Sequence, residues 1–298
     1  MPHRPPDPRV LDWVEDQLGA AVVGAERLTG GITADVDRLT LAGGRAPVVL
    51  RRWTDPETWP EHLVEREAAA LDAVDAVDAT VVPAPRLLAT DAGGHLTGVP
   101  SLLMTQVAGR VELTPTDRGA WLDDLARMLA TIHRQPPTLA ARVIHEDAAP
   151  DLHWLIDHGL RRDCLDIVET AASRYRDDEV FTHGDYQHFN ILWQDGRLSG
   201  VVDWPNAGTG PRGRDVGHCC LNLAVLVDPP TAVEFLQRYE REAGVTPDPV
   251  VVVRALLAFE PGWLEFIPRQ VAGRAPLDGP GMAGRVTTAI RCILQRSD

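Results

Sequence analysis

Polar side chains that can bind a metal or move a proton gather in one stretch of the second half of the chain. Asp185 and Asn190 are five residues apart in a polar loop, and Asp203 ends an apolar run further on. Two apolar runs, 191–193 and 198–202, are separated by turn residues and predict a β-hairpin. Phosphoryl transfer to an alcohol requires a carboxylate that receives the hydroxyl proton and oxygen ligands that hold Mg²⁺. The spacing suits Asp185 for the first role and Asn190 and Asp203 for the second.

An ordered set of motifs surrounds these residues. His183-Gly184-Asp185 with Asn190, followed by Val202-Asp203-Trp204 and Asp215, resembles the aminoglycoside phosphotransferase group of protein-kinase-like small-molecule kinases. The resemblance implies an α+β bilobal fold, with a mixed or antiparallel sheet and a helix in the N-terminal lobe and a mainly helical C-terminal lobe. It implies ATP or GTP as donor, Mg²⁺ as cofactor, a supporting role for His183, and a role for Asp215 in anchoring the catalytic loop or capping the next helix.

The loop also admits a plainer interpretation. Taken alone, Asp185 is most simply a turn residue, because aspartate favours turns. Its order with Asn190 and Asp203 favours catalysis instead. The insert 186–189 differs from the usual His- and Gly-containing insert of the family, and Pro205 stands where an acid is common. These departures remove no ligand, but they leave the substrate class open.

The strand predicted at 47–53 carries the candidate phosphate-binding cation. The chain contains no lysine, and all 29 of its basic residues are arginine. By resemblance, Arg51 occupies the place of the kinase lysine that holds the nucleotide phosphates, and arginine can grip phosphate in a forked geometry. Alternation places Arg51 on the face of Val49 and turns Arg52 the other way, so Arg52 is expected to be solvated.

A helix predicted at about 61–77 provides a partner for this cation. Glu67 lies on the apolar stripe that includes Leu63 and Val74. A carboxylate on a packing face needs a partner, and the kinase-like fold offers Arg51. The alternative is that Glu67 lies at the edge of the stripe and reaches water.

Further nucleotide contacts are expected at two places. The pair Gly30 and Gly31 lies in a predicted hairpin turn that could approach a phosphate closely, although a glycine turn between strands is ordinarily only a turn. By resemblance, backbone groups around Gln106 and Val107 bind the purine edge and Met104 forms its back wall. On residue type alone, Met104 is a core residue.

By resemblance, the residues around Gln106 and Val107 form the hinge between two lobes, a nucleotide-binding lobe, 1–106, and a catalytic and substrate-binding lobe, 107–298. Thr114 is predicted to cap the first helix of the second lobe, with Pro115 in its first turn. Further helices are predicted at 151–176, 216–227, 230–243, 248–259 and 281–295.

Residues 259–266 combine aromatic side chains with two carboxylates. Glu260, Trp263 and Glu265 could line a pocket for a hydroxylated amine. The helical spacing of Phe259, Trp263 and Phe266 favours core packing instead.

Composition limits the partners. A net charge of -14 argues against nucleic acid or an anionic membrane surface. Residues 145–180 carry 10 acids and 4 arginines, which favours a cationic ligand. The chain has neither an apolar run of about eighteen residues nor a signal-peptide pattern, so we expect a soluble cytoplasmic protein. The four cysteines are expected to be buried thiols, because neither they nor His218 have zinc-site spacing.

Three hypotheses follow. The first is an enzyme that transfers phosphate from a nucleotide to the hydroxyl group of a small molecule, with a polycationic, aminoglycoside-type antibiotic as acceptor. The second is a metabolic kinase of an amino alcohol or a sugar. The third, from a different class, is a nucleotide-binding pseudokinase. The intact set Asp185, Asn190 and Asp203 argues against the third, and the missing lysine argues for it.

Overall fold

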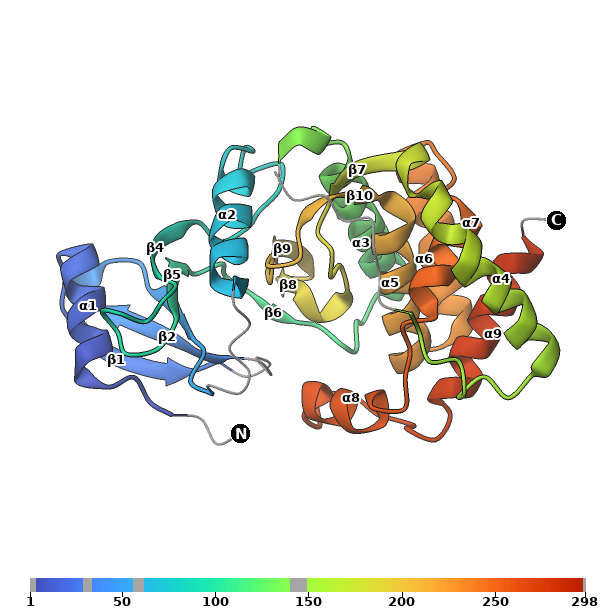
Figure 1. The fold of residues 1–298 in the computed structure, drawn as a ribbon. Coiled ribbons are helices and arrows are strands. Elements are labelled where there is room, and N and C mark those ends of the chain that lie inside the picture. The colour runs from blue at the N-terminus through green and yellow to red at the C-terminus, as the bar shows by residue number, and fades with distance from the viewer. Residues whose placement is uncertain (1–3, 29–33, 56–61, 140–148, 297–298) are drawn as a thin grey trace. The chain divides into compact units, whose positions relative to one another are not determined.

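The structure is a computed structural model that describes residues 4–28, 34–55, 62–139 and 149–296. The chain divides into two compact units, Met1–Ala108 and Gly109–Asp298. The first unit contains an antiparallel sheet with two helices, and the second is mainly helical (Figure 1). The predicted α+β bilobal fold class is confirmed.

The N-terminal unit is built on a five-stranded sheet in the order β1-β2-β3-β5-β4. Every neighbouring pair is antiparallel, so the sheet is not mixed. The strands are β1 (Val22–Arg27), β2 (Asp35–Leu41), β3 (Val48–Arg52), β4 (Leu87–Asp91) and β5 (Ser101–Thr105). The central strand, β3, carries Arg51.

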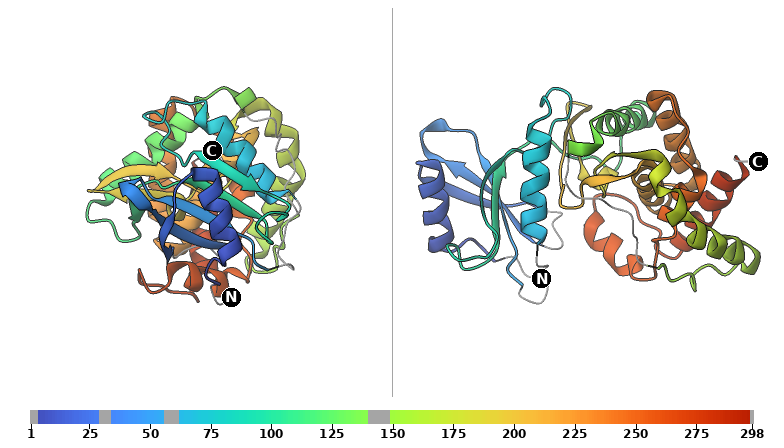
Figure 2. Two further views of the ribbon diagram at one scale, coloured as in Figure 1. Left: turned by 90° about the vertical axis from the view of Figure 1, so that its left-hand side faces the viewer. Right: turned by 45° about the horizontal axis from the view of Figure 1, so that its top comes forward.

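The two helices of this unit, α1 (Pro8–Leu18) and α2 (Leu63–Asp75), cover opposite faces of the sheet (Figure 2). Trp13 and its apolar neighbours on α1 pack against Leu39 and Leu50. Each such side chain contributes about 1.5–3 kcal/mol by leaving water. Because side chains alternate along a strand, Arg51 points to the face of α2.

Arg52 corrects the sequence-based expectation, because its side chain is buried rather than solvated. Only 3% of the residue is exposed, and a terminal nitrogen lies 2.7 Å from Asp37 Oδ2. Arg52 also donates a hydrogen bond to the backbone oxygen of Arg4. The alternation of side chains along β3 correctly predicted that Arg52 and Arg51 lie on opposite faces of the sheet. It could not show that the face of Arg52 is also covered by other residues.

The C-terminal unit contains two small antiparallel sheets, one of β6, β8 and β9 and one of β7 and β10. Their bounds are β6 (Arg110–Val111), β7 (Glu179–Thr182), β8 (Ile191–Gln194), β9 (Arg197–Val201) and β10 (Gly208–Pro211). The strands β8 and β9 are the predicted hairpin, and the left-handed residues Asp195 and Gly196 turn the chain between them.

Helices form the body of this unit, with α5 packed against α6, α7 and α9. Their bounds are α3 (Arg118–His133), α4 (His158–Arg174), α5 (Arg212–Leu226), α6 (Pro229–Ala243), α7 (Pro249–Leu256), α8 (Trp263–Val271) and α9 (Met282–Gln295). The helices predicted in this part of the chain are present. Across the described residues, no helix has the length and apolar character needed to cross a bilayer.

The start of α3 differs from the prediction. The helix begins at Arg118, and Asp117 caps it by accepting a hydrogen bond from Ala120 N at 3.0 Å. Thr114 is therefore not the cap. Both residues are good caps, so the local sequence alone could not choose between them.

Candidate active site

A buried carboxylate fixes the backbone of the loop that carries the predicted chemistry, residues 183–190, here called the site loop. Asp215 Oδ2 accepts a hydrogen bond from His183 N at 2.7 Å, and Oδ1 accepts one from Gly184 N at 2.8 Å. Burial raises the pKa of Asp215, but the hydrogen bonds from His133 and from the amide of His183 outweigh burial and hold this pKa below its usual value. Asp215 thus anchors the loop as a carboxylate. It does not cap α5, which begins three residues earlier, at Arg212.

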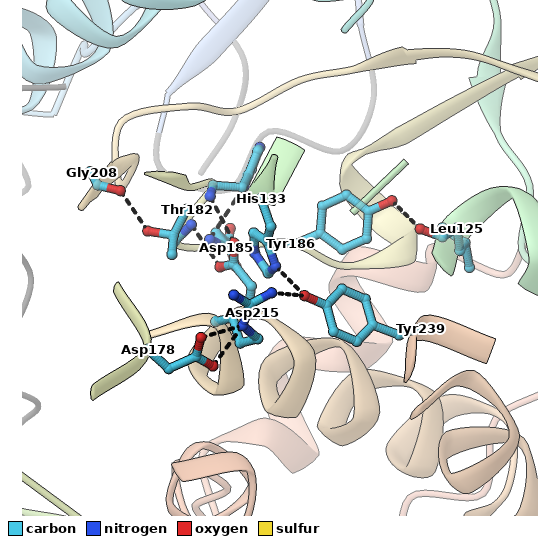
Figure 3. A network of polar contacts seen from close by, with 12 residues as sticks. Leu125, His133, Asp178, Thr182, Asp185, Tyr186, Gly208, Asp215 and Tyr239 are labelled. Atoms are coloured by element: carbon cyan, nitrogen blue, oxygen red, sulfur yellow. Dashed lines mark hydrogen bonds and ion pairs between the residues drawn. The ribbon is translucent and has the colours of Figure 1, made fainter. Parts of the chain in front are cut away.

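A chain of polar groups, buried at His133 and Tyr239 and half-buried at Arg212 and Asp178, supports Asp215 in turn (Figure 3). His133 Nε2 lies 3.2 Å from Asp215 Oδ2, and His133 Nδ1 lies 2.7 Å from the hydroxyl of Tyr239. That hydroxyl lies 3.3 Å from Arg212 Nη1, and Arg212 Nε is paired with Asp178 at 2.5 Å. Burial lowers the pKa of His133, with the arginine charge adding to this and the carboxylates opposing it. With a neutral ring, Arg212 donates to Tyr239, Tyr239 to His133, and His133 to Asp215.

His183 holds the site loop from inside. Its Nε2 lies 3.1 Å from Val202 O, and its Nδ1 accepts a hydrogen bond from Asp185 N at 3.2 Å. Burial lowers the pKa of His183 despite the opposing charges of three nearby aspartates. A neutral ring with its proton on Nε2 satisfies both contacts and links the loop to the end of the hairpin.

Gly184 is required by the loop's geometry. Its φ is +80°, a left-handed conformation that favours glycine. A Cβ atom at this position would lie 2.0 Å from the backbone oxygen of Asn206. No other residue fits without moving the chain.

Asp185 is a partly exposed carboxylate surrounded by donors. Its Oδ1 lies 2.7 Å from His218 Nε2 and accepts from Gln187 Nε2 at 2.9 Å, while Oδ2 accepts from Asn190 Nδ2 at 3.0 Å. Burial raises the pKa of Asp185, but the hydrogen bond and charge of His218, with the hydrogen bond from Asn190, outweigh burial and lower this pKa. About a quarter of the side chain, 25%, is exposed. Asp185 is therefore an ionised acceptor that solvent can reach.

His218 and Gln187 were not predicted as site residues. From the sequence, His218 was considered only as a possible zinc ligand. The available signal was the recurrence of Arg214, His218 and Asn222 at intervals of four residues, which places polar groups on one face of an otherwise buried helix.

The two predicted magnesium ligands are brought together by the hairpin. Asn190 Nδ2 donates to the backbone oxygen of Asp185 at 2.9 Å as well as to its carboxylate, which leaves Oδ1 of Asn190 as the ligand atom. Val202 N donates to Asn190 O at 2.9 Å, so Asp203 follows one residue beyond this contact. Asp203 has a φ of +71°, and such backbone strain in a non-glycine residue concentrates at functional sites.

This donor set suits magnesium better than a metal that needs a full protein cage. Mg²⁺ prefers oxygen ligands, and it commonly takes one or two carboxylates and completes its shell with water and phosphate oxygens. Among the residues that the structure describes, no group of three or more His, Cys, Asp or Glu side chains is arranged around a possible metal position. An amide oxygen and one carboxylate therefore fit the role, with nucleotide phosphates as the further ligands.

The four cysteines do not form a second metal site in the described residues. Cys164, Cys219 and Cys220 are buried, and Cys292 is half-buried. Burial raises the pKa of Cys164 to about 11 and also raises those of Cys219 and Cys220. Thiols with raised pKa values are poor sources of the thiolate that zinc binds.

In the N-terminal unit, Arg51 and Glu67 form the predicted ion pair. Arg51 Nη1 lies 2.8 Å from Oε1 and 2.9 Å from Oε2 of Glu67. The Glu67 side chain is only 2% exposed, so the alternative in which it reaches water is wrong. The guanidinium also lies over the ring of Trp53, with its carbon 5.1 Å from the ring centroid.

The other residues predicted to contact nucleotide lie mainly on or just after β5. Met104 is buried and pairs with Val49, as a core residue would. Gln106 Oε1 accepts a hydrogen bond from Arg38 Nε at 3.0 Å, and Val107 is half-buried. Gly30 and Gly31 lie outside the described residues.

With this geometry established, comparison with known families is decisive. The profile of the phosphotransferase enzyme family matches residues 24–250. The chain belongs to this family. Membership confirms the predicted aminoglycoside phosphotransferase resemblance and the predicted enzyme class, a small-molecule kinase. Comparison with curated proteins returned no match.

Solved structures share the fold of this phosphotransferase. A candidate aminoglycoside phosphotransferase from Ralstonia eutropha has a TM-score of 0.62 at 17% identity, over 96% of this chain and 98% of the other. A thermostable mutant of aminoglycoside phosphotransferase APH(4)-Ia, solved with ADP and hygromycin B, has 0.60 at 15%, over 96% and 98%. A candidate fructosamine-3-kinase from Thermobifida fusca has 0.57 at 19%, over 96% and 98%.

The segment that the sequence assigned to the acceptor lies largely on the surface of the phosphotransferase's C-terminal unit. Glu260 and Glu265 are exposed, and Trp263 is half-buried at the start of α8. Phe259 is buried against Trp154, with ring centroids 4.9 Å apart, as core packing predicts. Phe266 is 39% exposed, so the core interpretation is wrong at that position.

The acid-rich segment is partly neutralised within the unit. Asp157 pairs with Arg291, and Asp178 pairs with Arg212. These arginines come from α9 and α5, beyond the segment in which the charges were counted. The local excess of acid is therefore smaller than the sequence suggested.

Proposed function

We propose that this protein transfers the γ-phosphate of ATP or GTP to a hydroxyl group of a small molecule, with an aminoglycoside-type or other cationic antibiotic as the first acceptor to test. The observation that carries the proposal is the environment of Asp185. Its carboxylate is ionised, reachable from solvent and hydrogen-bonded to Asn190, the residue that suits the metal. A carboxylate beside a metal ligand is the arrangement that phosphoryl transfer to an alcohol requires.

Asp185 aligns and deprotonates the acceptor. The hydroxyl donates a hydrogen bond to the carboxylate, which directs the oxygen toward the γ-phosphorus for in-line attack. The new oxygen–phosphorus bond forms as the bond to the β-phosphate oxygen breaks, the proton passes to Asp185, and the nucleoside diphosphate leaves. Because the pKa of Asp185 is lowered, the carboxylate is a weak base. A weak base takes the proton late, after the bond to the leaving phosphate oxygen has largely broken, and this order suits a loose transition state.

Asn190 Oδ1 and the Asp203 carboxylate would hold Mg²⁺. The bound ion supplies positive charge to the phosphate oxygens. The chain's contribution is to orient the two ligands, through the Asn190 amide that is tied to Asp185 and the backbone contact between Val202 and Asn190.

Arg51 is proposed to bind the nucleotide phosphates, with Glu67 fixing its side chain. Met104, Gln106 and Val107, with the glycines at 30 and 31, are the proposed neighbours of the base and phosphates. The structure of the aminoglycoside phosphotransferase APH(4)-Ia holds ADP, which supports a nucleotide as donor here.

A metabolic kinase that phosphorylates an amino alcohol or a sugar is the second candidate. The likeness to a candidate fructosamine-3-kinase favours it, because that name implies a sugar-derived amine rather than an antibiotic. In either case Glu260, Trp263 and Glu265 are the proposed acceptor contacts, since they offer carboxylates and an aromatic face to an amine.

The test is phosphate transfer from ATP and from GTP, in magnesium, to a panel of aminoglycosides, macrolides, amino alcohols and sugar amines. We expect one class to stimulate turnover and Asp185→Ala to lower it roughly 10²- to 10⁴-fold. Asp195→Asn, which removes a carboxylate from the exposed hairpin turn, should leave the rate unchanged. Binding of nucleotide without transfer to any acceptor would instead favour the pseudokinase.

A further inference from the structure

The hydrogen bonds of Asp185 are distributed unequally between its two oxygens. An ionised carboxylate offers about four lone-pair sites. Among the described residues, His218 and Gln187 occupy both sites of Oδ1, whereas Asn190 alone occupies Oδ2. With respect to the described part of the chain, one acceptor site therefore remains, and it lies on Oδ2.

The direction of the contact between His218 and Asp185 follows from its chemistry. An ionised carboxylate can only accept, so the 2.7 Å contact requires a proton on His218 Nε2. Asn222 Nδ2 lies farther from the same nitrogen, at 3.2 Å, and donates to the backbone oxygen of His218 at 3.0 Å. Asn222 thus lies along the same helix face and borders the ring without competing for its donor.

A single helix supplies the anchors of both the loop backbone and the carboxylate. Asp215 and His218 lie three residues apart on α5, which places them on one face. Asp215 binds the amides of His183 and Gly184, while His218 binds the Asp185 side chain. The rest of α5 is largely buried against α6, α7 and α9, so this face is held rigidly.

We propose that His218 is a positioning residue of the transfer reaction. By donating to Oδ1, it fixes the rotation of the Asp185 carboxylate and leaves Oδ2 as the atom that receives the proton of the acceptor hydroxyl. As the hydroxyl oxygen bonds to phosphorus and the nucleoside diphosphate leaves, that proton moves to Oδ2. This inference rests on the proposed function of Asp185.

Gln187 cannot replace His218 in this role. Gln187 belongs to the site loop itself and moves with Asp185, whereas His218 comes from a separate, buried helix. Without His218 the carboxylate keeps its hydrogen bonds from Gln187 and Asn190, but both donors belong to the loop and can shift together with it. A misplacement of about 1 Å can cost about 10²-fold in rate, so the loss should appear in kcat.

The experiment compares His218→Leu with His218→Gln. Leucine fills similar space without a donor, and the amide of glutamine can reach the position of Nε2. We expect His218→Leu to lower kcat roughly 10- to 100-fold with the nucleotide KM within about threefold, and His218→Gln to recover most of the loss. Cys220→Ala, on the same helix but facing Ala232 of α6, is the matched control and should keep its kcat.

The outcomes separate the two proposals. If Asp185→Ala abolishes transfer while His218→Leu keeps the wild-type kcat, the positioning role is overturned and the proposed function stands. If Asp185→Ala itself keeps the wild-type rate, the proposed function fails, and this inference fails with it. Equal rates for the leucine and glutamine variants would also overturn the role. If His218→Leu does not fold, His218→Asn, whose amide is too short to reach Oδ1, replaces it in the comparison with glutamine.

Discussion

The buried ion pair between Arg51 and Glu67 allows a quantitative test of the N-terminal unit. Removing one partner by Glu67→Leu leaves the Arg51 cation in a site where its side chain is only 10% exposed. Removing one partner of a buried ion pair costs about 3–5 kcal/mol. The contact of Arg51 with the ring of Trp53 offsets about 0.5–2 kcal/mol at most, so the loss of stability should remain large.

A second ion pair of the same helix provides the control. Asp75 on α2 pairs with Arg86 at 2.7 Å, a distance close to the 2.8 Å of the buried pair, but these side chains are 40% and 65% exposed. Exposed pairs contribute about 0–1 kcal/mol. Asp75→Leu should therefore destabilise the unit far less than Glu67→Leu, although the two contacts have similar lengths.

The assay is urea unfolding of each variant, with hydrogen exchange of the β3 amides used to follow this unit separately, because a chain of two units need not unfold in one step. The double variant Arg51→Met with Glu67→Leu should regain most of the loss, since both charges of this pair are then replaced by apolar side chains. If Glu67→Leu costs no more than Asp75→Leu, or if the double variant is worse than either single one, burial of the pair does not determine its energy.

Three further predictions concern the support of the site loop. Gly184→Ala should abolish transfer because its Cβ would lie 2.0 Å from Asn206 O, whereas Gly196→Ala, which is also left-handed but has no atom within 4 Å, should cost only about 1–2 kcal/mol in thermal unfolding; equal effects on activity would contradict this. Tyr239→Phe should destabilise the C-terminal unit by about 1–3 kcal/mol in urea, because it removes the buried hydroxyl that joins His133 to Arg212; an unchanged midpoint would refute it. Burial lowers the pKa of His133 below its unfolded value of about 6.5, so its contribution to stability is present above that pH and lost as pH falls toward the folded pKa. An NMR titration of the ring that showed protonation near pH 6.5 in the folded protein would contradict the last prediction.

The sequence predicted those parts of the site that depend on short-range spacing. Asp185 and Asn190 share one loop, and Asp203 follows a hairpin that brings it back beside Asn190. Local chain geometry alone therefore assembles these residues. The pair of Arg51 and Glu67 could be predicted from the sequence for a different reason, because a carboxylate on an apolar helix face needs a partner.

The parts that the sequence did not predict depend on contacts between distant elements. Arg52 looked solvated because its covering residues, Arg4 and Asp37, belong to segments 48 and 15 residues away. His218 lies 33 residues after Asp185, and nothing local shows which face of α5 turns toward the site loop. Burial on a particular face is a property of the packed unit, so a polar residue in an apolar helix marks a candidate without naming its partner.

The position of His218 gives α5 a role that the linear motifs do not contain. The motifs around Asp185 and Asp203 supply the proposed reacting and metal-binding groups, and Asn190 binds the Asp185 carboxylate from within the same loop, but they provide no contact that ties this carboxylate to a separate element. Asp215 fixes the loop by its backbone, and this alone would still permit the side chain to rotate. Gln187 and Asn190 bind the carboxylate from within the loop, and the contact from His218 ties it to a separate helix. Because Asp215 and His218 belong to one buried helix, that helix holds both the backbone of the loop and the Asp185 carboxylate in fixed positions relative to each other. An acceptor hydroxyl can be held in line with a phosphate only if the carboxylate that binds it is fixed in this way.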